Sequence, residues 1–172
     1  KTFKPDFKVH SNWQKRLWVQ IHAKNGDSTI DGRKEGILVH DLMAEVSCAK
    51  DVSAVVTNAL RSGNINKQEY DHYLQMLKNI VDHPQLSRFY QEDIEVYNEK
   101  DILIPQKFIV RPDRIVKNKD GWVIIDYKTG KERPNHFAQI SYYAELLEEM
   151  TQEKSKCYLV YIGKNTIVKT IE

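Results

Sequence analysis

The chain is poor in cysteine, and the two cysteines it has are not spaced to bind a metal. Cys48 and Cys157 lie far apart in the 172 residues, and no Cys-x-x-Cys pair occurs. Structural zinc sites and iron–sulfur clusters draw several ligands from closely spaced cysteines. The sequence therefore excludes a zinc site or iron–sulfur cluster built from cysteine, and both thiols are read as ordinary buried or half-buried side chains.

Long apolar runs and a strong charge imbalance are also missing. No segment approaches the ~18 consecutive apolar residues of a membrane span, and the start of the chain does not resemble a signal peptide, so we expect a cytoplasmic protein. The 26 Lys and Arg residues nearly balance the 24 Asp and Glu residues, for a net charge of +2. Any surface for nucleic acid must therefore come from local clustering of basic residues. Because the chain begins with Lys1 instead of Met, we expect a piece of a longer protein.

The length fits one domain with its own core, and we divide that domain into three parts. Residues 1–35 form an N-terminal extension, with an amphipathic helix at 13–21 and a polar, basic loop at 23–34. Residues 36–90 are predicted to be helical, and residues 91–172 form the core of a sheet. The predicted helices of the middle part are 36–46, 52–62 and 66–82, followed by a short turn at 84–89. A capping box of Asn66 and Glu69 opens the third of these helices.

In residues 91–172, apolar and polar side chains alternate as they do in strands, and the same part contains one long helix. The predicted elements are strands at 94–97, 102–110 and 122–127 in an antiparallel meander, a helix at 134–150, and strands at 157–162 and 166–170. This order predicts an α/β fold with a central mixed sheet of about five strands flanked by helices, to which the N-terminal helical region is added.

The stretch Val-Ile-Ile-Asp-Tyr-Lys-Thr-Gly at 123–130 organises the rest of the chain. It is typical of a buried strand that turns at Thr-Gly, and alternation places Asp126 and Lys128 on one face with Tyr127 on the other. By itself an Asp-x-Lys pair is most often an ordinary ion pair of little energetic value. Its meaning therefore depends on which other charged residues share that end of the sheet.

A second carboxylate is predicted to lie at the same end of the sheet as Asp126. Asp113 lies thirteen residues before Asp126, and a hairpin turn at 118–121 would bring both to one end of the sheet. Two carboxylates that close repel each other unless a cation neutralises them, and a hard divalent cation prefers oxygen ligands. With Lys128 beside it, such a site suits phosphodiester hydrolysis, in which the metal lowers the pKa of a bound water and the lysine steadies developing charge.

Four short motifs occur in an order that resembles a known family. They are Gly-Ile-Leu-Val-His at 36–40, Arg-Pro-Asp-Arg-Ile at 111–115, Asp-Tyr-Lys-Thr-Gly at 126–130 and Gln-Ile-Ser-Tyr-Tyr at 139–143. Together they resemble the RecB-type branch of the PD-(D/E)xK nucleases, which have a restriction-endonuclease-like fold. The resemblance is strongest to the C-terminal nuclease domain of UvrD-like helicase-nucleases of the AddA kind.

The resemblance implies a role for each matching residue. It makes His40, Asp113, Asp126 and the main-chain carbonyl of Tyr127 metal ligands, and Lys128 the catalytic lysine. Imidazole among the ligands suits Mn²⁺ at least as well as Mg²⁺, and the missing cysteines again exclude the iron–sulfur cluster of some relatives.

Other positions are matched more loosely. Gln139 and Tyr143 match positions that orient the lysine or place DNA. Glu99 matches an acidic position before the Asp113 motif, for which Glu95 competes. The family often has glycine where Arg111 or Pro112 stands here.

Basic residues around the motifs predict a rim that contacts the DNA backbone. The rim consists of the loop at 24–34 together with Arg114, Lys131 and Arg133, and binding through it should weaken steeply with salt. His136, beside Asn135 at a predicted helix start, is read as a surface residue and not as a ligand.

We therefore expect a Mg²⁺- or Mn²⁺-dependent DNA nuclease, an exonuclease of DNA repair and recombination acting on single strands. The expected partners are DNA, the helicase part of the same parent chain, and a second helicase-nuclease subunit. Two alternatives stay open at this point. One is a DNA-binding module of a helicase complex that does not cleave, and the other is an interaction domain whose Asp-x-Lys is only an ion pair.

Overall fold

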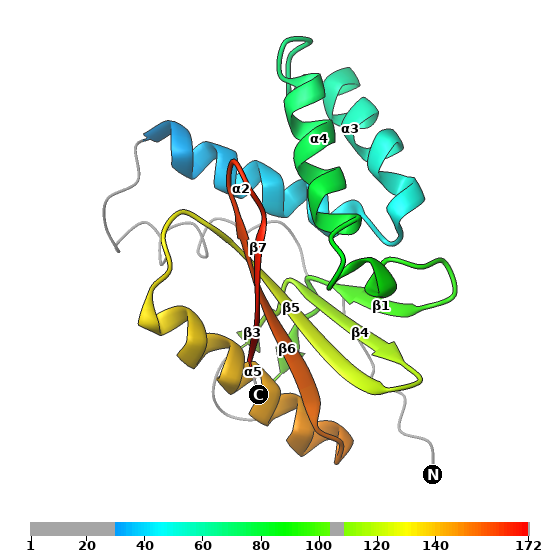
Figure 1. Ribbon diagram of the computed structural model, residues 1–172, viewed down its shortest axis with the longest axis vertical. Coiled ribbons are helices and arrows are strands. Elements are labelled where there is room, and N and C mark those ends of the chain that lie inside the picture. The colour runs from blue at the N-terminus through cyan, green and yellow to red at the C-terminus, as the bar shows by residue number, and fades with distance from the viewer. Residues whose placement is uncertain (1–29, 104–108, 172) are drawn as a thin grey trace.

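The computed structural model describes residues 30–103 and 109–171 of the chain, and a five-stranded mixed sheet forms its centre (Figure 1). The strands lie in the order β1-β4-β5-β6-β7. Neighbouring strands are antiparallel except for β5 and β6, which run parallel. The bounds of the sheet are β1 Glu95–Asn98, β4 Arg114–Asn118, β5 Gly121–Thr129, β6 Ser155–Ile162 and β7 Ile167–Ile171. The predicted mixed sheet of about five strands flanked by helices is confirmed.

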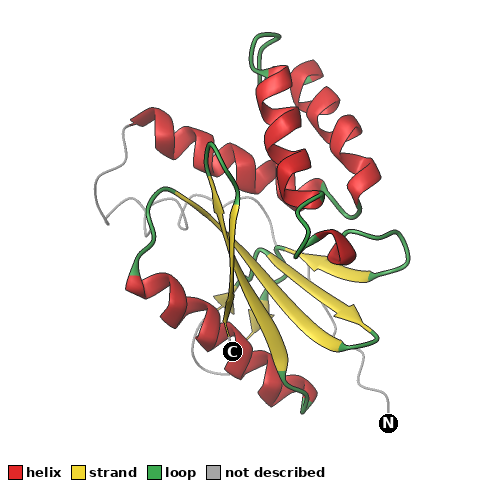
Figure 2. Ribbon diagram, viewed as in Figure 1, coloured by secondary structure: helices red, strands yellow, loops and turns green. Residues whose placement is uncertain are grey.

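Helices cover both faces of the sheet, as Figures 1 and 2 show. One face carries α2, α3 and α4, and the other carries α5, which makes the crossover from β5 to the parallel strand β6. The bounds of the helices are α2 Ile30–Glu45, η1 Ala49–Asp51, α3 Val52–Arg61, α4 Tyr70–Val81, η2 Ser87–Phe89 and α5 Pro134–Thr151. No helix in the described ranges is long and apolar enough to cross a membrane.

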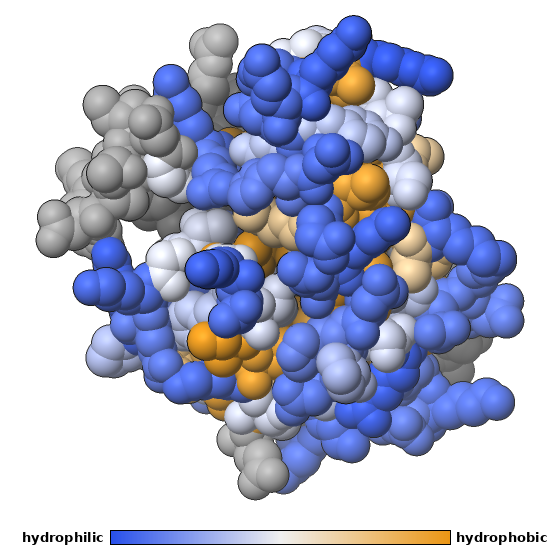
Figure 3. All heavy atoms as spheres, turned by 45° about the horizontal axis from the view of Figure 1, so that its top comes forward, coloured by the Kyte–Doolittle hydropathy of each residue, from blue (hydrophilic) through white to orange (hydrophobic). Residues whose placement is uncertain are grey.

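The central strand β5 is buried on both faces, which explains its continuous apolar run. Ile125 and Tyr127 pack in the core under α2 to α4, whereas Ile124 packs with Ile140 and Leu147 in a second core under α5. Alternation therefore turns Asp126 and Lys128 towards α5. Figure 3 shows that hydrophilic side chains predominate on one outer face, with smaller apolar areas between them.

One predicted strand and the predicted starts of two helices were wrong. The meander has β4 as its middle strand, not a strand at 102–110. The segments Ile102–Leu103 (β2) and Ile109–Val110 (β3) pair with each other in a separate small sheet, so the chain reverses between them. Pro105 in the middle of the predicted strand was a signal against it, because proline cannot donate to a sheet ladder.

The first described helix also starts at a different residue than predicted. α2 begins at Ile30, so the last residues of the predicted loop at 23–34 are helical, and the first residues of that loop lie outside the described ranges. The predicted helix at 13–21 also lies outside them. The capping box of Asn66 and Glu69 is confirmed by hydrogen bonds of 2.8 and 3.0 Å, and it precedes α4, which starts later than predicted.

Candidate active site

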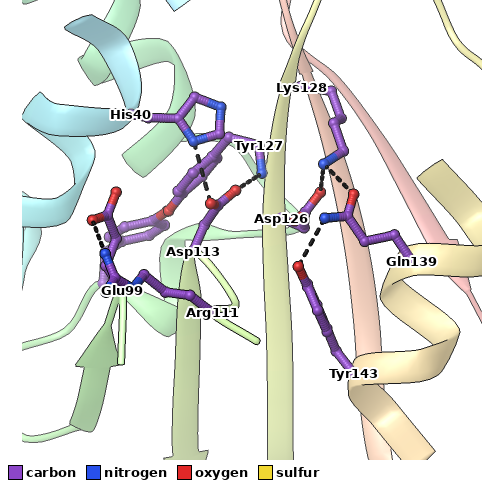
Figure 4. Close-up of polar contacts among 10 residues, drawn as sticks. His40, Glu99, Arg111, Asp113, Asp126, Tyr127, Lys128, Gln139 and Tyr143 are labelled. Atoms are coloured by element: carbon purple, nitrogen blue, oxygen red, sulfur yellow. Dashed lines mark hydrogen bonds and ion pairs between the residues drawn. The ribbon is translucent and has the colours of Figure 1, made fainter. Parts of the chain in front are cut away.

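Charged side chains converge where β5 ends, and Asp126 and Lys128 are at their centre (Figure 4). The two residues share one face of the strand, as predicted, and the Lys128 Nζ lies 2.5 Å from the Asp126 Oδ2. Their side chains are only 13% and 3% exposed. A lysine held this deeply against a carboxylate is not the solvated surface pair that the isolated motif would suggest.

Helix α5 supplies the next partners of Lys128. The Lys128 Nζ donates to the Gln139 Oε1 at 2.9 Å, and the Gln139 Nε2 donates to the Tyr143 Oη at 2.7 Å. Gln139 and Tyr143 are four residues apart and so lie on one face of the helix. Asp126, Lys128, Gln139 and Tyr143 thus form a continuous chain of polar contacts, which we call the α5 half of the site. It fixes the position of the lysine ammonium.

The second carboxylate arrives through the β4–β5 hairpin. Arg114 pairs with Ile125 across the two strands, which places Asp113 at the end of the sheet where Asp126 lies, as predicted. One oxygen of Asp113 accepts a hydrogen bond from the Tyr127 N–H at 2.7 Å, and the other lies 3.2 Å from the His40 Nδ1. His40, Asp113 and Tyr127 form the α2 half of the site, on the other side of β5 in Figure 4.

His40 reaches this position because α2 approaches the end of β5 closely. A Cβ at Gly36 would lie 2.5 Å from the Thr129 Oγ1, so a larger residue there would require the Thr129 side chain or the helix to shift. His40 follows Gly36 by one helical turn and lies on the same face. Its ring also meets the Tyr127 ring edge to face, with centroids 6.1 Å apart.

The two buried carboxylates differ in their affinity for a proton. Burial and the negative charge of Asp113 raise the pKa of Asp126 to about 7. Burial also raises the pKa of Asp113. The charge and hydrogen bond of His40, followed by Lys128 and the Tyr127 N–H, have a larger, opposite effect, so the pKa of Asp113 lies below its ordinary value. Burial lowers the pKa of His40, yet the neighbouring Asp113 carboxylate outweighs burial and raises it. Asp126 is therefore the carboxylate whose charge is least compensated by the protein.

The donors at this site fit a divalent cation in kind. They are two carboxylates, one imidazole and the Tyr127 carbonyl, which lies on the Asp113 side because the N–H and C=O of one strand residue point the same way. Within the described ranges, however, no three His, Cys, Asp or Glu side chains are grouped as metal ligands. His40 and Tyr127 contact Asp113, while Lys128 contacts Asp126.

Comparison with known proteins identifies the family of the chain. The model of the PD-(D/E)XK nuclease superfamily matches residues 13–170, which is most of the chain. The chain belongs to the PD-(D/E)XK nuclease superfamily. No curated protein matches the chain. A solved structure titled "Crystal structure of SSO0001" is similar over 91% of this chain and 74% of its own, with 16% identity and a TM-score of 0.36.

The acidic position that precedes the Asp113 motif can now be placed. Within this PD-(D/E)XK chain, the Glu99 N–H donates to the Asp113 carbonyl at 2.8 Å, so Glu99 lies beside the site. Its carboxylate lies 4.0 Å from the Arg111 Nη1, and Arg111 also donates to Asp101 at 2.7 Å. Glu95 pairs with Lys117 at the far end of β4. Of the two candidates, only Glu99 is close to the site, although its role stays a prediction.

The predicted basic rim needs one correction. Arg114 is fully buried, so it cannot contact a DNA backbone from the surface. Lys131 is exposed and Arg133 half-buried in the loop between β5 and α5, and their contact with DNA stays a prediction, while most of 24–34 lies outside the described residues. His136, predicted at the surface, is half-buried in the first turn of α5, with its Nδ1 3.2 Å from the Tyr161 Oη.

Two residues lie behind the α2 half. The sequence did not indicate Tyr90 there, and Arg114 was predicted at the surface instead. The Tyr90 and Tyr127 hydroxyls lie 2.5 Å apart, and the Arg114 guanidinium stacks on the Tyr90 ring at 4.2 Å. The sequence did contain a signal for Arg114. It lies two residues before the buried Val116 on β4, and residues two apart on a strand face the same side. No comparable sequence signal singles out Tyr90.

Proposed function

We propose that this chain is a divalent-metal-dependent deoxyribonuclease that hydrolyses phosphodiester bonds of DNA. The observation that carries the proposal is the position of Lys128. It is held between Asp126 and Gln139 at the strand end that also gathers Asp113 and His40. An ammonium fixed next to two carboxylates is suited to act on a water and a phosphate that an ion brings there.

The residues of the two halves would share the work. His40, Asp113, Asp126 and the Tyr127 carbonyl would hold Mg²⁺ or Mn²⁺, which when bound would polarise the phosphate and acidify a water. Lys128 would then leave Asp126 and orient that water or stabilise the charge on phosphate oxygens. Gln139 would keep the ammonium pointed at the reacting atoms, and Tyr143 would keep Gln139 in place.

The substrate and setting follow from the four motifs. Their order and content resemble the RecB-type branch, in the form found in AddA-like helicase-nucleases. We therefore propose an exonuclease that degrades single strands unwound by a helicase region of the same parent protein during double-strand-break repair or recombination. A second helicase-nuclease subunit is a proposed partner. Lys131 and Arg133, next to the strand end, are proposed to contact the DNA backbone.

The direct test is cleavage of labelled single-stranded DNA with Mg²⁺ or Mn²⁺. Asp126→Ala and Lys128→Ala should each lower the rate by about 100-fold or more, because each removes a group that acts on the reacting phosphate. Lys119→Ala is the matched control, since Lys119 is exposed in the turn between β4 and β5, at the opposite end of β5 from the site, and it should cleave like the wild type. Equal degradation by all four proteins would refute the catalytic assignment.

A second candidate is a DNA-binding module of a helicase complex that does not cleave. The observation in its favour is that the would-be ligands already satisfy one another, with His40 on Asp113 and Lys128 on Asp126. Such a module would bind single-stranded DNA equally well in EDTA and in Mn²⁺ and release no nucleotides. Metal-dependent release of nucleotides would rule it out.

A further inference from the structure

Arg114 is a buried cation that has no role in the proposed reaction. It opens β4 directly after Asp113, and none of its surface is exposed. Among the described residues, no carboxylate lies within ion-pair distance of its guanidinium. Burying a charge without a counter-charge is costly, so its retention needs contacts that compensate for it.

Those contacts lie at the C-terminal end of the helix that carries His40. The Arg114 Nη1 donates to the Val46 carbonyl at 2.8 Å, and its Nη2 donates to the Ser47 carbonyl at 2.8 Å. These two residues follow α2 directly, and α2 has no basic residue in its own last turn. Helix ends leave unpaired carbonyls and a partial negative charge, both of which a guanidinium satisfies.

Asn98 completes this attachment from the neighbouring strand. It faces Arg114 across β1 and β4 and accepts a hydrogen bond from the Arg114 Nη1 at 3.0 Å. Its Nδ2 donates to the carbonyls of Ala44 and Val46 at 3.0 and 2.9 Å. Hydrogen bonds from the Arg114 guanidinium and the Asn98 amide therefore tie the end of α2 to two strands.

A second path leads from Arg114 to the strand side of the site. Its Nη2 also donates to the Phe89 carbonyl at 2.8 Å, and its guanidinium lies 4.2 Å from the centre of the Tyr90 ring. The Tyr90 hydroxyl bonds to that of Tyr127, whose N–H donates to Asp113. Arg114 thus supports both groups that contact the Asp113 carboxylate, His40 and Tyr127.

We propose that Arg114 is a positioning residue that sets how His40 and Tyr127 meet Asp113, by tying the end of α2 and the Tyr90–Tyr127 pair to the start of β4. It does not touch the substrate, and it acts through the two residues it holds. The role in metal binding rests on the proposed function, whereas the positioning itself is a property of the metal-free protein. The two can be tested separately.

The metal-free test measures amide hydrogen exchange in Arg114→Lys. Lysine keeps the charge but offers no planar fork to reach several carbonyls at once. We expect the exchange rate of the Tyr127 amide to rise about tenfold relative to that of the Leu159 amide in the centre of β6, because local opening of the α2 half becomes easier. The control Arg88→Lys makes the same change at an exposed arginine, which lies on the Phe89 ring and donates to Tyr158, and should leave this ratio unchanged. An unchanged ratio in Arg114→Lys would overturn the proposal.

The metal-dependent test is a double-mutant cycle on Mn²⁺ affinity, measured by calorimetry. Arg114→Lys should weaken Mn²⁺ binding about tenfold in the wild type but less than about threefold in His40→Ala, where the ligand it positions is gone. Equal weakening in both backgrounds indicates a merely structural role and overturns the proposal.

Two further outcomes are also decisive. If the wild type binds no Mn²⁺, the proposed function fails, while the metal-free exchange ratio still decides the role of Arg114. If Arg114→Lys does not fold, Asn98→Ala takes its place, because it removes two hydrogen bonds to the end of α2 and one acceptor of Arg114. The same exchange ratio should then rise by roughly threefold, and no rise would overturn the proposal.

Discussion

The two halves of the candidate site are built in different ways. The α5 half (Asp126, Lys128, Gln139 and Tyr143) comes from one strand and the helix that follows it directly. The α2 half (His40, Asp113 and Tyr127) joins residues 73 positions apart, and its helix is held to the sheet by core packing and by the hydrogen bonds of Arg114. The α5 half therefore positions the lysine through local contacts, whereas the α2 half depends on tertiary packing to position its donors.

The largest expected effect separates the two halves by their chemistry. Lys128→Ala should lower cleavage by about 100-fold or more yet keep the stabilisation by Mn²⁺, because it removes no metal donor. Asp113→Asn should lose both cleavage and that stabilisation. At Mn²⁺ concentrations of 100 times the dissociation constant, stabilisation of the wild type amounts to about 2.7 kcal/mol.

Thermal unfolding with and without Mn²⁺ measures this difference. Lys119→Ala serves again as the control and should respond to the ion as the wild type does. If Asp113→Asn is stabilised by Mn²⁺ as much as the wild type, Asp113 is not a metal ligand.

The next effect concerns the pH dependence of the metal-free protein. The pKa of Asp126 is about 7 in the folded state against an ordinary 3.8, so the folded protein keeps a proton that the unfolded chain has lost. The free energy of unfolding should therefore fall as the pH rises from about 4 to about 7. The raised pKa of His40 acts in the same direction above 6.5, and the lowered pKa of Asp113 matters only below 3.8.

Asp126→Asn isolates the contribution of that one carboxyl. Urea unfolding in EDTA at several pH values should show a weaker decline for the variant than for the wild type. Parallel profiles would mean that Asp126 ionises in the folded protein as readily as in the unfolded chain.

A smaller effect is expected at the support of the lysine. Gln139→Ala removes the acceptor of Lys128 and the donor to Tyr143, and should lower the rate of cleavage about tenfold without changing Mn²⁺ affinity. Gln75→Ala, on α4, is the matched control because Gln75 bonds only to Asn79 among the contacts described. A loss of Mn²⁺ affinity in Gln139→Ala would show that the two halves are not separate.

The smallest effect distinguishes the two acidic candidates near the α2 half. Glu95→Gln should change cleavage by less than about twofold, because Glu95 lies at the far end of β4 and its surface charge contributes little. Glu99→Gln should reduce cleavage more than Glu95→Gln does, since Glu99 lies beside Asp113 and the change removes the negative charge that its side chain holds 4.0 Å from Arg111. A larger loss from Glu95→Gln would contradict the placement, with initial cleavage rates as the measurement.

The difference between the halves also explains how far sequence reasoning reached. Alternation along β5 sufficed to put Asp126 and Lys128 on one face, and helical spacing put Gln139 beside Tyr143. The hairpin turn allowed Asp113 to be placed at the same strand end. In each case the relation is local, so residue spacing fixes the geometry.

The place of His40 in the α2 half was accessible only through the resemblance to a family. Nothing in local spacing brings His40 to Asp113, since their contact depends on the close packing of α2 that Gly36 permits. The burial of Arg114 could have been predicted from Val116 on the same face of β4, but its partners could not: they are carbonyls from separate segments, at Val46, Ser47 and Phe89, and carbonyl positions are not encoded in residue type. Tertiary contacts of this kind follow from the whole fold.

The most direct test of the central claim is an anomalous difference map from crystals of this domain grown with Mn²⁺. We expect a peak bounded by His40, Asp113, Asp126 and the Tyr127 carbonyl, with Lys128 released from Asp126. A protein that binds Mn²⁺ elsewhere, with the His40–Asp113 and Lys128–Asp126 contacts intact and no peak between them, would contradict it.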